Sequence, residues 1–158
     1  MKLSAKLICY HLQKSFPMDT SRLDTEPTLL CPACYEKNTP LQEGRVYLIT
    51  DPDFQPTFHH PKNILFLMIG KTYRNYELTQ PNMCVIPEDF PANTIFNKLQ
   101  EIFILYDRWN QSLMDSRLRN ASIQELLDLT ASIIPNPMML IGMDFTIIAS
   151  RGWDLGDL

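Results

Sequence analysis

The stretch NTIFNKLQEIFILYDRWNQSLMDSRLRN, residues 93–120, has the strongest helical periodicity in the chain. Its large apolar residues recur in alternating steps of four and three, which is the spacing of a helix with one apolar seam. These residues are Ile95, Leu99, Ile102, Tyr106, Trp109 and Leu113. We expect a helix from Asn93, its N-cap, to Arg119, which would be roughly 39 Å long.

The length of this helix predicts a role in assembly, because a small globular domain does not need a helix of seven turns. Phe96 and Phe103 form a second apolar row beside the seam. One row can pack on the chain's own sheet while the other contacts a second copy of the chain. The residues expected at this dimer interface are Leu99, Ile102, Tyr106, Trp109 and Leu113.

Three short apolar segments that precede the helix predict strands at Val46–Thr50, Ile64–Ile69 and Met83–Ile86. The segments between them are too long for tight hairpins, so we expect a small, parallel or mixed sheet flanked by helices. Leu3–Phe16, with Ser4 as its cap, predicts a short amphipathic helix over that sheet. The fold class is therefore α/β, with α+β as the alternative. The polar segment Met18–Pro27 predicts a loop.

Leu29, Leu30 and Cys31 could begin a strand, which Pro32 and the polar segment Glu36–Pro40 would soon end.

A second set of elements follows the long helix. Ser122 and Glu125 have the spacing of a capping box, which predicts a further helix over Ile123–Ile134. Two apolar strands are then expected at Met138–Ile141 and Phe145–Ile148, as a hairpin. Because two strands do not make a stable sheet alone, this hairpin must pack on another element. We expect three parts: an α/β domain at 1–92, connector and dimerisation helices at 93–135, and the start of another domain at 136–158.

Composition excludes several classes of function. The chain has 158 residues, 45% apolar content and a net charge of −4, with no basic stripe for nucleic-acid phosphates. Its longest apolar run, Ile64–Ile69, is too short to span a bilayer, and the first sixteen residues lack a signal-peptide pattern. We therefore expect a cytoplasmic protein that binds no membrane.

The pair Cys31 and Cys34 is the sharpest chemical motif in the sequence. A Cys-X-X-Cys at a helix N-terminus would support disulfide exchange, but the residues after Cys34 form a poor helix. The interpretation we prefer is a turn with two ordinary thiols. A zinc half-site is an alternative, completed by His59 or His60 and by Cys84, although this spacing fits no standard zinc finger.

Other candidate site residues lie in the proline-rich loop after the first expected strand. His59, His60 and Asp51 are candidate ligand-binding residues near the ends of the strands. Asp51 and Asp53 could form a carboxylate pair, but the flanking prolines make a turn the simpler interpretation. The chain has no glycine-rich phosphate loop and no recognised catalytic triad motif, so we expect neither an enzyme nor a cofactor.

A family resemblance is carried by the second half of the chain and by two earlier strands. Its features are the long helix with Tyr106 and Trp109, the segment SIQELLD at 122–128, Asn136-Pro137 before a strand, Asp144 in its turn, Ile148-Ala149-Ser150, and the strands at 46–48 and 64–69. Together they resemble the amino-terminal region of PucR/CdaR-like transcriptional regulators of anaerobic Gram-positive bacteria.

This resemblance implies a sensor domain, a linker helix, and the first hairpin of a PAS- or GAF-like domain. It implies a non-catalytic module that senses a small-molecule effector and forms homodimers. The helix-turn-helix of that family is missing from this sequence, so DNA binding would belong to a region outside it. Two other classes stay open: a small zinc or redox protein centred on Cys31 and Cys34, and a scaffold without a ligand.

Overall fold

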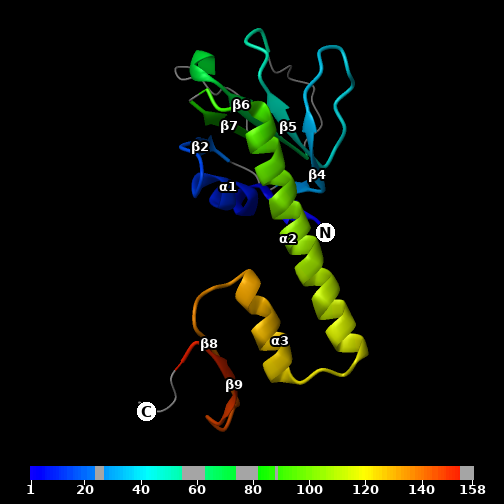
Figure 1. Cartoon of the computed structure of the whole chain (residues 1–158), viewed down its shortest axis with the longest axis vertical. Helices are drawn as coiled ribbons and strands as arrows, with labels where there is room; N and C mark the ends of the chain where they lie inside the picture. The colour runs from blue at the N-terminus through cyan, green and yellow to red at the C-terminus, as the bar shows by residue number, and fades with distance from the viewer. Residues whose placement is uncertain (24–26, 55–62, 74–81, 88, 154–158) are drawn as a thin grey trace. The chain divides into compact units, whose positions relative to one another are not determined.

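The computed structural model describes residues 1–23, 27–54, 63–73, 82–87 and 89–153 (Figure 1). They form a mixed α/β fold, which confirms the expected class. The chain divides into two compact units, Met1–Phe103 and Ile104–Leu158, and the boundary falls inside the long helix.

The first unit is built on a five-stranded mixed sheet with the order β2-β7-β6-β5-β4. Neighbouring strands from β4 to β7 are parallel, and β2 is antiparallel to β7. The bounds are β2 Asp19–Arg22, β4 Cys31–Cys34, β5 Arg45–Ile49, β6 Ile64–Ile69 and β7 Met83–Ile86. The three strands expected from apolar segments are therefore confirmed, and β6 is buried along its whole length as predicted.

The two faces of this sheet have separate apolar cores. Tyr47 is the register partner of Phe66, which is the partner of Met83, and these side chains belong to one buried cluster with Phe54 and Tyr73. Side chains alternate between the faces of a strand. Cys84, next to Met83, therefore points to the other face.

Helix α1 (Ala5–Gln13) packs on the face that carries Cys84, because the Sγ atoms of Cys9 and Cys84 lie 3.6 Å apart. Ser4 caps the helix as expected, since its hydroxyl oxygen accepts a hydrogen bond from the Leu7 amide at 3.3 Å. The short strands β1 (Leu3–Ser4) and β3 (Thr28–Leu29) pair antiparallel beside it.

Two expectations about the first unit were wrong. Part of the expected loop at 18–27 is β2, whose polar residues Asp19–Arg22 become a strand because the edge of β7 offers them a hydrogen-bonding partner. The strand at Leu29 is β3, which ends at that residue, and Pro32 lies inside a separate strand, β4, which begins at Cys31. A proline is tolerated there because β4 is an edge strand.

Helix α2 (Ala92–Leu118) confirms the expected long helix. It begins before Asn93, because the carbonyl of Pro91 already accepts hydrogen bonds from the Thr94 and Ile95 amides. Asn93 is therefore inside the first turn and is not the N-cap. The 3-10 helix η1 (Lys71–Tyr73) also belongs to the first unit.

The second unit contains the end of α2, α3 (Ile123–Leu129), η2 (Thr130–Ser132), β8 (Met138–Ile141) and β9 (Ile147–Arg151). The capping box is confirmed: the Ser122 hydroxyl accepts from the Glu125 amide at 3.2 Å, and the Glu125 carboxylate accepts from the Ser122 amide at 2.8 Å. The hairpin of β8 and β9 packs on α3 as expected. Gln124 makes two hydrogen bonds with the backbone of Ser150, of 2.9 and 3.2 Å.

Two boundaries in the second unit differ from those expected. α3 ends at Leu129, five residues early, because the Thr130 hydroxyl donates to the Leu127 carbonyl at 2.6 Å and the next turn tightens into η2. β9 begins at Ile147 because Phe145 has a φ of 64° and extends the turn.

Among the helices in the described ranges, none combines the length and the apolar character needed to cross a bilayer.

Candidate functional site

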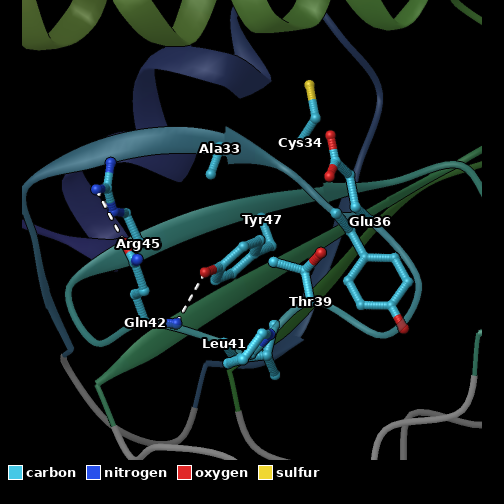
Figure 2. A pocket seen from close by; sticks show the side chains of 10 residues that line it. Ala33, Cys34, Glu36, Thr39, Leu41, Gln42, Arg45 and Tyr47 are labelled. Carbon is cyan, nitrogen blue, oxygen red and sulfur yellow. Dashed lines mark hydrogen bonds between the residues drawn. The ribbon is translucent and has the colours of Figure 1, made fainter.

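A concave site lies at the connection between β4 and β5. This connection borders an open pocket of about 210 Å³ (Figure 2). The connection turns at Asn38 and Gly44, whose φ angles are 67° and 74°. Gly44 is needed there, since a Cβ would lie 3.2 Å from the side chain of Leu30 and the positive φ would strain it.

One side of the pocket is formed by Arg45, the first residue of β5. Its Nη1 donates to the Sγ atom of Cys31 at 2.6 Å, and its Nη2 donates to Oε1 of Gln42 at 3.1 Å. These two bonds hold the plane of the guanidinium and leave other N–H donors of its fork. Within the described part of the chain, no carboxylate forms a salt bridge with Arg45.

The floor of the pocket is the ring of Tyr47. This side chain is 7% exposed, and its hydroxyl oxygen accepts a hydrogen bond from the Gln42 amide at 2.8 Å. A tyrosine hydroxyl that accepts in this way still has its own hydrogen to donate. The ring contacts the core, with its centroid 6.4 Å from that of Phe66.

The opposite side of the pocket is formed by Thr39 and by the segment around Glu36. Figure 2 shows the Glu36 carboxylate beside Cys34, directed away from the Tyr47 ring. A turn holds Glu36 and Thr39 near each other, because the Thr39 amide donates to the Glu36 carbonyl at 3.1 Å. Leu41 adds an apolar wall. The pocket therefore has a cationic side at Arg45 and an apolar floor with hydroxyl groups.

The pocket is supported directly by the buried core. Ala33, Tyr35 and Leu41 line it and also pack against the cluster around Tyr47 and Phe66. Tyr35 makes an edge contact with Phe54, at 4.8 Å between ring centroids. Side chains fixed by a packed core keep their positions without a ligand, so the pocket is formed in advance.

The Cys31 and Cys34 motif is not the turn that we preferred from the sequence. Both residues lie in the extended strand β4. Residues three apart on a strand point to opposite faces, with Cα atoms about 10 Å apart, whereas a disulfide needs less than about 7 Å. Disulfide exchange within the motif is therefore excluded in this conformation, because it needs the thiols side by side.

The cysteines of the alternative zinc site also lie too far apart to share a metal ion. Cys84 lies on β7 and contacts Cys9, while Cys31 and Cys34 lie on β4, three strand spacings away. That separation is about 14 Å, and a zinc ion holds its sulfur ligands at about 2.3 Å. His59, the fourth ligand considered, lies outside the described residues. No cluster of three or more histidine, cysteine or acidic side chains suited to a metal ion occurs among the residues described.

The proline-rich loop holds three candidate ligand-binding residues, His59, His60 and Asp51. His59 and His60 lie outside the described ranges. Asp51 and Asp53 form a turn, as we preferred: the Asp53 amide donates to the Asp51 carboxylate at 3.0 Å, and the Tyr73 hydroxyl donates to the Asp51 carbonyl. Asp51 thus stabilises the turn through its carboxylate, and it does not line the pocket.

The predicted dimer residues divide into two groups by burial. Leu99, Ile102 and Tyr106 are 0%, 3% and 3% exposed, so the chain itself already covers them. A second copy cannot contact these three side chains without opening the fold. Trp109 and Leu113 are half-buried, and their exposed atoms are available to a partner.

No protein-family model matches this chain, and comparison with curated proteins and with solved structures gives no significant match. The site must therefore be interpreted from its own geometry. Sequence reasoning missed its main residues, which are Glu36, Thr39, Gln42, Arg45 and Tyr47. The available signal was an arginine at the start of a buried strand, directly after a polar segment.

Proposed function

We propose that this chain is the signal-sensing and dimerisation module of a PucR/CdaR-like transcriptional regulator. In this proposal the first unit binds a small-molecule effector in the pocket between β4 and β5 and catalyses no reaction. DNA binding belongs to a region outside this sequence. The protein acts in the bacterial cytoplasm, and the second unit begins a PAS- or GAF-like domain.

The observation that carries the proposal is a preformed pocket on a unit from which a long helix leads into another unit. Ile95 and Leu99 of α2 are fully buried in the core of the first unit, and the same helix continues past Phe103 into the second. A ligand that favours one packing of this core changes the free energy of the attached helix as well. A helix shared by both units is therefore suited to carry the effect of ligand binding from the first unit to the second.

A second copy of the chain is the proposed partner of the C-terminal part of α2. Trp109 and Leu113 present half-buried apolar surface there, and Met114 and Leu118, one turn apart, are 51% and 83% exposed. The Trp109 Nε1 atom is buried, and no described group accepts its hydrogen bond. Because the chain itself covers this N–H, the surface that Trp109 offers a second copy is the exposed part of its ring.

Sedimentation velocity tests this assembly. We expect the purified chain to form dimers at tens of micromolar and Trp109→Ala to shift it toward monomer, because the variant loses the largest aromatic surface of the proposed interface. Trp109→Phe keeps the apolar ring and removes only the N–H donor. It should weaken the dimer less than Trp109→Ala does.

The matched control is Tyr10→Ala, which removes an aromatic side chain that is 56% exposed on α1. This variant should sediment as the parent chain does. A parent chain that stays monomeric throughout this concentration range, with Trp109→Ala unchanged, would rule out the proposed interface.

A further inference from the structure

We propose that Cys9 and Cys84 form a site of reversible oxidation, at which a hydroperoxide converts the two thiols into a disulfide between α1 and β7. This inference goes beyond the proposed function and does not depend on it. It rests on the distance between the two sulfur atoms, on their burial, and on the helix that covers them.

The two sulfur atoms lie close enough to bond after a small movement. Their separation is 3.6 Å, whereas the sulfur atoms of a disulfide lie about 2.05 Å apart. Rotation of the two side chains, with a slight shift of α1, closes a gap of about 1.5 Å. The two cysteines are 75 positions apart in the sequence, so it is the fold that brings them together. The folded chain therefore favours this pair over the two cysteines of β4.

One molecule of hydroperoxide balances the reaction. The first thiolate attacks the peroxide: an S–O bond forms, the O–O bond breaks, and the sulfur becomes a sulfenic acid as an alcohol or water leaves with the proton of the thiol. The second thiol attacks this sulfur, so that the S–S bond forms and the S–O bond breaks with loss of water. The two cysteines together lose two electrons and two protons, and a thiol reductant returns both.

Burial determines when the thiols react. The side chains of Cys9 and Cys84 are 2% and 0% exposed, so α1 in its closed position keeps a peroxide away from them. The hydrogen bond with Cys9 and burial also raise the pKa of Cys84, and a protonated thiol is a poor nucleophile. Both effects are lost when α1 moves away from the sheet. Local opening of this helix therefore controls the rate of oxidation.

The position of α1 gives the disulfide its consequence. This helix has nine residues and depends on packing of one buried face, which includes Ile8 and Leu12. A covalent bond from Cys9 to β7 would hold that face on the sheet. Phe16, three residues beyond the helix, makes an edge contact with Phe90, at 5.1 Å between ring centroids, just before α2 begins. Oxidation therefore stabilises the first unit beside the start of the long helix.

Peptide mapping of the full chain tests the pairing. We would treat the folded, reduced chain with hydrogen peroxide, block the remaining thiols with iodoacetamide, and digest at acidic pH without reductant. We expect the main cross-link within one chain to join Cys9 to Cys84, and to disappear on reduction with dithiothreitol. The same treatment in concentrated urea is the control. An unfolded chain closes the short loop between Cys31 and Cys34 more readily than a long loop, so there the selection should be lost.

Urea unfolding shows what the cross-link does to the fold. We expect oxidation to raise the urea midpoint of the first unit by about 1 M, because a cross-link over a long loop restricts the unfolded chain. Cys9→Ala should form no such cross-link, and oxidation should not raise its midpoint. Cys34→Ala, which lacks an exposed thiol, is the matched control and should respond as the parent does. The parent chain alone decides the pairing if Cys9→Ala fails to fold.

Three results would overturn the inference. The first is a folded chain in which Cys9 and Cys84 stay unpaired after the exposed thiols are fully oxidised. The second is a Cys9 to Cys84 cross-link that forms in urea but not in the folded chain. The third is a cross-linked chain with a lower urea midpoint than the reduced chain, because the fold would then be strained by the bond. Each of these leaves the proposed effector pocket and dimer interface untouched, since neither contains Cys9 or Cys84.

Discussion

At the scale of single residues, the contact between Cys9 and Cys84 joins α1 to the sheet. The side chains are 2% and 0% exposed, and neither belongs to the motif that stands out in the sequence. The hydrogen bond with Cys9 and burial both raise the pKa of the Cys84 thiol. The folded protein therefore keeps this thiol protonated at a pH where an exposed thiol ionises.

This difference predicts that the first unit loses stability in alkaline solution. An unfolded cysteine ionises near pH 8.5, while folded Cys84 holds its proton, so the stabilisation is complete below that pH and is lost above it. The loss is about 1.4 kcal/mol per pH unit for this group. Cys84→Ala should cost about 1 kcal/mol at neutral pH and show a shallower alkaline slope.

Urea unfolding followed by fluorescence at several values between about pH 7 and pH 10 measures both slopes. The two proteins share every lysine and tyrosine, so the difference between their slopes isolates the thiol. Cys34→Ala, which removes an exposed thiol, is the control and should follow the parent profile. Equal slopes for Cys84→Ala and the parent would contradict the prediction.

At the scale of elements, α3 depends on its N-terminal cap. None of its side chains is buried, so this short helix gains little from packing. The hydrogen bonds from the Ser122 amide and hydroxyl lower the pKa of Glu125, and the capping box is therefore complete at neutral pH. The same helix holds the hairpin through Gln124 and Ser150. Loss of the capping box should therefore lower the stability of both α3 and the hairpin.

We predict that Ser122→Ala destabilises the second unit by about 1 kcal/mol, because the Glu125 amide loses its acceptor. Amide hydrogen exchange across α3 and β9 would report this as faster opening. Ser132→Ala is a matched control in the same segment, since that hydroxyl makes only a 3.4 Å bond to the Leu129 carbonyl. Equally faster hydrogen exchange in both variants would show that the Ser122 cap does not specifically stabilise α3.

At the scale of the whole molecule, the two units differ in the size of their cores. The first contains the buried sheet, whereas from Ile104 onward the buried apolar side chains among the described residues are Tyr106 and Ala149. The hairpin instead exposes large apolar side chains, including Met143 at 103% and Phe145 at 88%. Hydrophobic burial is the main stabilising contribution to folding, so the second unit should be the less stable one.

We predict that amides of β8 and β9 exchange roughly a hundredfold faster than those of β6, a difference of about 3 kcal/mol in opening free energy. Hydrogen exchange read by mass spectrometry resolves the three strands. Repeating it at high protein concentration is the control for assembly, since protection of the hairpin would then rise if a second copy covers it. Equal protection of β6 and the hairpin in dilute solution would contradict the prediction.

Local patterns were enough to predict most of the elements. The buried strands β5, β6 and β7, the helix α2, the capping box of α3 and the hairpin after it were all expected from apolar periodicity and cap residues. These features depend on neighbours in sequence, because a helix forms its hydrogen bonds within one segment and a buried strand needs an apolar run.

The edge strands and the pocket could not be predicted in this way. Asp19–Arg22 is polar and Cys31–Cys34 contains a proline, yet both are strands because β7 and β5 present free edges to them. The meeting of Arg45, Gln42 and Tyr47 in one pocket likewise depends on the connection between β4 and β5. Long-range pairing decides these features, and no local pattern in the chain encodes it.

The sequence by itself determined the α/β class, the long helix and the apolar seam along it. The tertiary structure decided which part of that seam is free: Leu99, Ile102 and Tyr106 are covered by the chain, and Trp109 and Leu113 are only partly covered. It also separated Cys84 from Cys31 and brought Arg45 and Glu36 to one pocket. The physical reason is that periodicity shows which side chains avoid water, whereas only the packed fold shows what covers them.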